Sequence, residues 1–164
     1  MSRKAIAFTG PSGSGKTTTI EKIANMLVSQ RHVAIVKHDP SDKAIFDTAG
    51  KDSDRFFKTG ADVAVLSPTR TTVFTHQSRE IKQIASMFET FDLLIVEGLK
   101  TLPLPRIGIF RNTIEEDYLS VVEAIAIDES IDINAYTIPS HIAVLDLNDT
   151  SAIIEWIDQH STEI

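Results

Sequence analysis

The sequence predicts an α/β fold with a mostly parallel sheet flanked by helices. Short apolar runs of strand length alternate along the chain with segments whose apolar residues recur at helical spacing. This is the order expected of strand–helix–strand units joined by right-handed crossovers. Residues 93–96 are apolar at every position, which is typical of a parallel strand covered on both faces. The chain has 164 residues without a repeat or a long linker, so we expect a single domain over 1–164.

The other elements follow from the same two patterns. The apolar runs predict strands at residues 5–8, 33–36, 63–66, 71–74, 107–110, 124–127 and 142–145. Helical spacing predicts helices over residues 15–30, 53–59, 78–89 and 151–160. Residues 67–70 are a turn sequence, and in the helix before it we expect Phe56 and Phe57 to face partly inward. The polar connection at residues 38–52 is long, as functional loops often are.

Composition narrows the classes of protein. The 16 Lys and Arg against 23 Asp and Glu give a net charge of −7, which argues against nucleic acid as a partner. The chain has no Cys, which excludes a disulfide, a thiol nucleophile and a cysteine-ligated metal. No apolar run approaches the ~20 residues that cross a bilayer, and the N-terminus does not read as a signal peptide. We therefore expect a cytoplasmic protein without a membrane partner.

Residues 10–17 read G-P-S-G-S-G-K-T and match the phosphate-binding pattern G-x-x-x-x-G-K-[ST] at every fixed position. The match follows a predicted strand and opens a predicted helix, so the sequence predicts a P-loop NTPase fold. In such a loop the backbone N–H groups surround a phosphate, Lys16 reaches the β- and γ-phosphates, and the Thr17 hydroxyl ligates Mg²⁺. The predicted nucleotide-binding residues are Gly10, Pro11, Ser12, Gly13, Ser14, Gly15, Lys16, Thr17 and Thr18.

A P-loop site also needs a carboxylate at the end of a neighbouring strand. Glu97 follows the apolar run 93–96 and is expected at the carboxyl edge of the sheet, where open α/β folds bind their ligands. Asp92 lies at the opposite end of that strand, about 16 Å away at ~3.3 Å per residue. We therefore assign Glu97, with Lys16, to catalysis and, with Thr17, to the metal; the alternative is a solvated residue at a strand end.

The next predicted strand ends in Lys37, His38 and Asp39, which either contact phosphate, a second substrate or Mg²⁺, or simply begin a polar loop. The remaining histidines are scattered and form no metal-ligand spacing. The chain lacks the Asn-Lys-x-Asp motif of many GTPases, so the sequence leaves GTP and ATP open. It also lacks the Arg-rich lid of small-molecule kinases. Its dispersed arginines are expected on the solvated surface: Arg55, Arg70, Arg79, Arg106 and Arg111.

Several motifs come in a recognisable order. After the P-loop and Lys37-His38 they are Gly50-Lys51-Asp52-Ser53 with Arg55, Gly60-Ala61, Val96-Glu97-Gly98-Leu99-Lys100, and Pro105-Arg106-Ile107 before Arg111. Together they resemble the MobB family, molybdopterin-guanine dinucleotide biosynthesis protein B, as far as about Arg111. The G-K-D-S-x-R segment followed by V-E-G-x-K narrows the choice to this family. The chain departs from it at Asp39-Pro40, where further His residues are frequent, and at Leu99, where Phe is usual.

The resemblance implies a GTP-binding adapter with Mg²⁺, weak GTPase activity and a homodimer. It also implies a helper role in converting molybdenum cofactor to molybdopterin guanine dinucleotide, beside a separate guanylyltransferase. It assigns Lys16 and Thr17 to phosphate and Mg²⁺ and Glu97 to the acidic strand end. The resemblance also implies that Asp52, Ser53, Arg55 and Lys100 line the site. With Lys37, His38 and Asp39 at the strand end, they are the candidate second-substrate or switch residues.

Two other functions stay open at this point. A small-molecule kinase would transfer the γ-phosphoryl group of ATP, and it would need a mobile lid that excludes water. A nucleotide-dependent carrier of another metal cofactor would need clustered soft ligands, which a chain without Cys and with scattered His does not supply.

Overall fold

The computed structural model describes residues 3–164, and its contacts divide the chain into two compact units. Met1–His38 and Phe88–Ile164 form the first, here called the sheet unit. Asp39–Met87 form the second, here called the hairpin unit. The single domain that the sequence suggests therefore stays a prediction.

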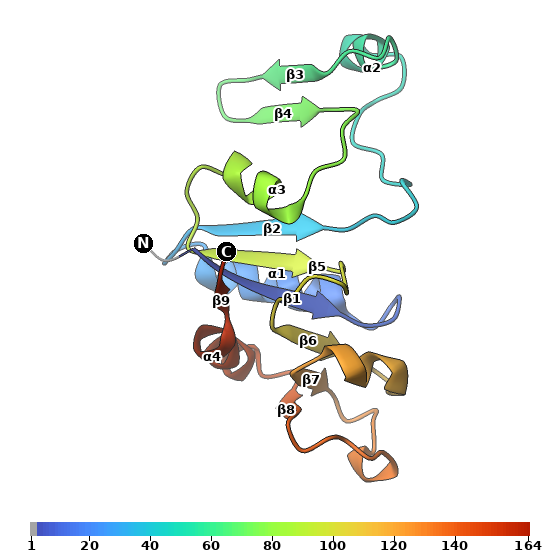
Figure 1. Ribbon diagram of the computed structural model, residues 1–164, viewed down its shortest axis with the longest axis vertical. Coiled ribbons are helices and arrows are strands. Elements are labelled where there is room, and N and C mark those ends of the chain that lie inside the picture. The colour runs from blue at the N-terminus through green and yellow to red at the C-terminus, as the bar shows by residue number, and fades with distance from the viewer. Residues whose placement is uncertain (1–2) are drawn as a thin grey trace. The chain divides into compact units, whose positions relative to one another are not determined.

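The sheet unit is built on parallel strands, which confirms the predicted fold class (Figure 1). The strands are β1 (Lys4–Thr9), β2 (Val33–Lys37), β5 (Leu93–Glu97), β6 (Arg106–Ile109), β7 (Ala124–Ile127) and β8 (Ala143–Asp146). Their order is β2-β5-β1-β6-β7-β8, and each neighbouring pair is parallel. A short strand that the sequence did not predict, β9 (Thr162–Glu163), pairs antiparallel with β1.

Two helices cover one face of this sheet. Helices α1 (Lys16–Leu27) and α4 (Thr150–His160) share one apolar core with the strands. From α1 it receives Ile20, Ile23 and Leu27, and from α4 it receives Ile153, Trp156 and Ile157. Both helices were predicted, but α1 ends at Leu27, well before residue 30. The backbone carbonyl of Leu27 there accepts hydrogen bonds from the N–H groups of both Gln30 and Arg31, which turns the chain toward β2.

Beside β6 and β7, a second apolar cluster forms around Phe110, Val122 and Ile125. It is bordered by two short 3₁₀ helices that the sequence did not predict, η1 (Glu116–Val121) and η2 (Ile133–Ala135). The side chains on both faces of β1 and β5 are buried, which holds the carboxyl ends of these strands in fixed register.

The hairpin unit contains α2 (Asp52–Phe57), the antiparallel strands β3 (Val63–Leu66) and β4 (Thr71–Phe74), and α3 (Ile81–Met87). The predicted turn is present, since the N–H of Ser67 donates to the carbonyl of Arg70 at 2.9 Å. The expectation that two phenylalanines face inward is right only for Phe57, whose ring stacks on His76 at 3.9 Å between centroids. The expectation is wrong for Phe56, whose relative exposure is 59%.

Candidate nucleotide site

The loop between β1 and α1 has the geometry of a phosphate cradle. Gly10 has a φ of 141°, and a side chain there would begin 2.3 Å from the backbone oxygen of Ile109 in β6. Only glycine lets the loop come this close to the neighbouring strand. Ser14 is buried, and its hydroxyl has no hydrogen-bond partner among the described residues. A buried, unsatisfied hydroxyl inside the loop fits a polar ligand.

The loop leads directly into α1, so the uncapped N-terminus of this helix also faces the phosphate cradle. Gly15 is the N-cap, with a φ of 99° and no side-chain cap, and the first turn carries no acidic residue. The first N–H groups of the helix are therefore left for an anion, together with the positive end of the helix dipole. Thr17 and Thr18 lie in this exposed first turn. Thr17 also lines an opening of about 300 Å³ together with Lys37 and Glu97.

Lys16 folds back over the cradle. Its Nζ donates to the carbonyls of Gly10 at 2.8 Å and Pro11 at 2.7 Å. Burial lowers the pKa of Lys16, while Glu97 acts in the opposite direction and Lys37 and Lys100 reinforce the lowering. Three ammonium groups and one carboxylate thus influence each other at this edge of the sheet, which makes the edge attractive to a polyanion.

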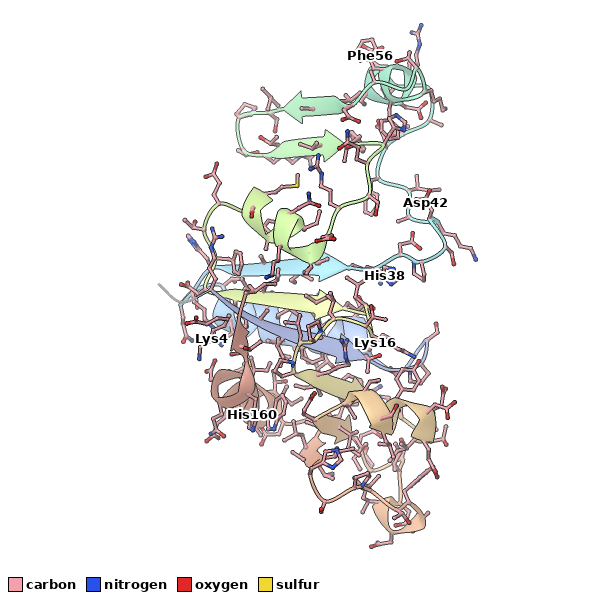
Figure 2. All side chains as sticks on the ribbon, in the orientation of Figure 1. Lys4, Lys16, His38, Asp42, Phe56 and His160 are labelled. Carbon is pink, nitrogen blue, oxygen red and sulfur yellow. The ribbon has the colours of Figure 1, made fainter. Side chains whose placement is uncertain are left out.

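Glu97 ends β5 directly beside the end of β2, because Lys37 and Glu97 are register partners. Its carboxylate is mostly buried and ion-paired with Lys37. His38 follows at the same edge, and its N–H donates to the carbonyl of Glu97 at 3.0 Å. Figure 2 shows Lys16 and His38 at the carboxyl end of the strands, with Lys4 at the other end. Asp92 lies at that other end, where its carboxylate accepts from the N–H of His32.

The loop after Glu97 is held by Arg106, which corrects the expectation of a solvated arginine. Arg106 is 1% exposed, and burial lowers the pKa of its guanidinium. Its guanidinium donates to the carbonyls of Gly98 at 2.8 Å, Leu99 at 3.0 Å and Leu102 at 3.0 Å. Sequence reasoning missed this role, although an arginine that opens the apolar strand run 107–110 is itself a signal of burial.

Lys100 lies in the loop that Arg106 holds. Its ammonium sits over the ring of Tyr118, 3.6 Å from the centroid. Arg111 is the second residue whose role the sequence did not reveal. It is exposed, as expected, but its guanidinium packs on Gly15 of the phosphate cradle.

Four predicted site residues belong to the hairpin unit: Asp39, Asp52, Ser53 and Arg55. The carboxylate of Asp39 accepts from the backbone N–H groups of Ser41, Lys43 and Ala44, so it shapes the start of that unit. Asp52 and Ser53 open α2. A part for these four in nucleotide or substrate binding stays a prediction.

Thr17 and Glu97 line one opening, and a hydroxyl with a carboxylate is a donor set that fits a hard cation such as Mg²⁺, which takes few protein ligands and keeps phosphate and water. Within residues 3–164 no three His, Asp or Glu gather as a separate metal site. None of the helices described there is both long and apolar enough to cross a membrane.

Comparison with known sequences points to one family. The family model for molybdopterin guanine dinucleotide synthesis protein B matches residues 5–128. A molybdopterin-guanine dinucleotide biosynthesis adapter protein of Haemophilus influenzae is 28% identical over 162 residues, which cover 93% of this chain and 86% of the relative. A probable adapter protein of the same biosynthesis from Bacillus subtilis is 31% identical over 133 residues, covering 74% of this chain and 73% of the relative.

Solved structures agree on the fold. The crystal structure of Bacillus subtilis MobB superposes with a TM-score of 0.75 at 21% identity, covering 98% of this chain and 99% of that one. A LAO/AO transport system kinase follows at a TM-score of 0.53 and 14% identity, covering 98% of this chain and 59% of that one. The predicted P-loop NTPase fold is thereby confirmed. With the family match over residues 5–128, the chain belongs to the MobB family.

Proposed function

We propose that this chain is a GTP-binding adapter with weak GTPase activity that assists the conversion of molybdenum cofactor to molybdopterin guanine dinucleotide. The observation that carries the proposal is the phosphate cradle of residues 10–17, with Lys16 over it, in a chain of the MobB family. The relatives are named adapters of this biosynthesis, which supports the helper role. GTP is the nucleotide that the family resemblance implies.

Each charged group at the edge has a role in holding the nucleotide. The N–H groups of the loop and the α1 N-terminus bind the β- and γ-phosphates, and Lys16 turns its ammonium toward them. Lys37 and Lys100 add positive charge around the same point. Thr17 and Glu97 hold Mg²⁺, which neutralises charge on the phosphates when bound.

The same geometry accounts for weak hydrolysis. A base that activates water needs a free lone pair near the γ-phosphate. Glu97 is the carboxylate at the end of β5, and its two oxygens already accept from the ammonium of Lys37. A carboxylate neutralised in this way draws a proton from water poorly. The site therefore holds the triphosphate well and cleaves it slowly, which suits an adapter.

The homodimer is supported by the surface of the hairpin unit. Ile45, Phe46 and Leu66 are 88%, 81% and 78% exposed, and Phe56 of α2 is exposed too. A two-stranded sheet with two short helices has little core of its own. A second copy of the chain would cover these side chains. The expected result is a dimer in sedimentation measurements, weakened by Leu66→Asp.

The partners proposed for the adapter are molybdenum cofactor and its guanylyltransferase in the cytoplasm. The test is a reconstitution from purified guanylyltransferase, molybdenum cofactor, Mg²⁺ and GTP, with the formation of molybdopterin guanine dinucleotide as the readout. Wild-type protein is expected to increase product formation, and Lys16→Ala is expected to lose most of that increase. Equal yields with and without the wild-type protein would contradict the proposal.

A further inference from the structure

The carboxyl ends of β6 and β7 are tied together beside the phosphate cradle. Arg111 follows β6 and Asp128 follows β7, and the Nε of Arg111 lies 3.1 Å from a carboxylate oxygen of Asp128. The other carboxylate oxygen accepts from the backbone N–H and the hydroxyl of Ser130. The Ser130 hydroxyl in turn accepts from the N–H of Asn112 at 2.7 Å. Arg111 is therefore held by its Nε edge.

This network keeps the carboxylate charged. The hydrogen bond from the Ser130 side chain lowers the pKa of Asp128, and the charge of Arg111 acts in the same direction. Asp128 is mostly buried, with 13% of its side chain exposed, whereas Arg111 has 43% of its side chain exposed. Asp128 is thus the fixed, buried partner of the pair, and the guanidinium of Arg111 faces outward.

One face of the guanidinium lies flat on the loop. From the point where a side chain of Gly15 would begin, the Nε, Cζ and Nη2 atoms of Arg111 are 3.5, 3.6 and 3.8 Å away. Three atoms of one plane at nearly equal distances place that plane face-on to the side-chain position of Gly15. With Nε paired to Asp128, the two Nη groups donate no hydrogen bond to any described residue.

We propose that Arg111 is a stacking platform for the purine base of the bound nucleotide. The inference rests on the proposed function, in which the loop that ends at Gly15 binds the phosphates of the same nucleotide. Guanidinium planes stack on aromatic rings, and bases stack on arginine planes in many proteins. The crevice at the carboxyl ends of parallel strands is also where nucleotides lie in open α/β folds. Because Asp128 neutralises Arg111, the pair is a poor ligand for phosphate.

The test separates the base from the phosphates. Calorimetry measures the affinity of Arg111→Ala and wild-type protein for Mg²⁺-bound GTP, ATP and inorganic tripolyphosphate. The expected result is a loss of about tenfold for both purine nucleotides and a change of less than about twofold for tripolyphosphate. Arg31→Ala is the matched control, because Arg31 is also paired with an aspartate, Asp158. Arg31 precedes β2 at the amino end of the strands, away from the phosphate cradle, so its replacement should leave all three affinities unchanged.

Three outcomes would overturn the platform. An equal loss for tripolyphosphate would make Arg111 a phosphate ligand. Unchanged affinity for all three ligands would leave Arg111 structural, with the proposed function intact. A wild-type protein that binds neither GTP nor ATP would contradict the proposed function, and the stacking role of Arg111 with it. If Arg111→Ala does not fold, Arg111→Lys keeps the charge opposite Asp128 and loses the plane, and the same comparison applies to it.

Discussion

The ammonium of Lys37 bridges both oxygens of the Glu97 carboxylate, at 3.2 and 3.1 Å. The two residues are register partners on adjacent parallel strands, so the sheet itself places them together. The carboxylate that is proposed to hold Mg²⁺ is therefore already paired with a cation. A metal at this position competes with Lys37.

Replacing Lys37 should make the metal easier to bind. Because 62% of its side chain is exposed, the ion pair is worth no more than ~1 kcal/mol. With saturating GTP, Lys37→Met is expected to lower the Mg²⁺ concentration for half-maximal hydrolysis by about two- to fivefold. The control is Lys58→Met, which removes an exposed lysine paired with Asp54. A Mg²⁺ requirement that stays the same or rises in Lys37→Met would show that the pair does not limit the metal.

Glu97→Gln should weaken hydrolysis more than binding. The substitution keeps the size of the side chain and removes the charge that organises metal and water, while the loop amides and Lys16 still hold the phosphates. Single-turnover phosphate release and calorimetry with GTP give the two quantities. Asp92→Asn at the opposite end of β5 should change neither. Equal losses of hydrolysis and binding would make Glu97 a ground-state ligand instead.

Arg106→Ala should destabilise the sheet unit. Three carbonyls would lose their buried donor, which predicts a loss of about 2–4 kcal/mol in the free energy of unfolding. Urea unfolding measures it, with Arg70→Ala in the exposed hairpin turn as a control expected within ~0.5 kcal/mol of wild type. A loss below ~1 kcal/mol would mean that the loop of residues 98–102 does not depend on Arg106.

Intrinsic turnover should be slow. The carboxylate at the site is paired and no arginine-rich lid is evident in the sequence, so steady-state phosphate release from GTP is expected well below ~1 s⁻¹. The assay is repeated with ATP and a panel of small hydroxyl acceptors. Rapid transfer to any acceptor would favour the kinase alternative over the adapter.

Local signals explain what could be predicted. The apolar runs gave most strands to within a residue, because strand formation here follows short β-branched stretches such as residues 33–36. The helix predicted over 15–30 was too long, because the chain turns after Leu27 while residues 28–30 contain no Gly or Pro to mark the end. Strand β9 is two residues long and exists through its pairing with β1, which no local pattern encodes.

The site residues likewise fall into those that local sequence predicts and those that depend on tertiary packing. The phosphate loop is contiguous in sequence, so its residues were predicted together, and Glu97 followed from the end of an apolar strand. The Lys37–Glu97 pair depends on β2 lying next to β5, and the Arg111–Asp128 pair depends on β6 lying next to β7. Strand order is set by tertiary packing, so these pairs could not be predicted from spacing.

The central claim is that residues 10–17 bind a nucleoside triphosphate, and Lys16→Ala tests it most directly. Calorimetry with Mg²⁺ and GTP is compared between wild type, Lys16→Ala and Lys22→Ala, an exposed lysine on the same helix. Lys16→Ala is expected to weaken binding by about 100-fold at unchanged circular dichroism, since charge-assisted hydrogen bonds contribute ~1.5–3 kcal/mol. Lys22→Ala should bind like wild type. Unchanged GTP affinity in a folded Lys16→Ala protein would contradict the claim.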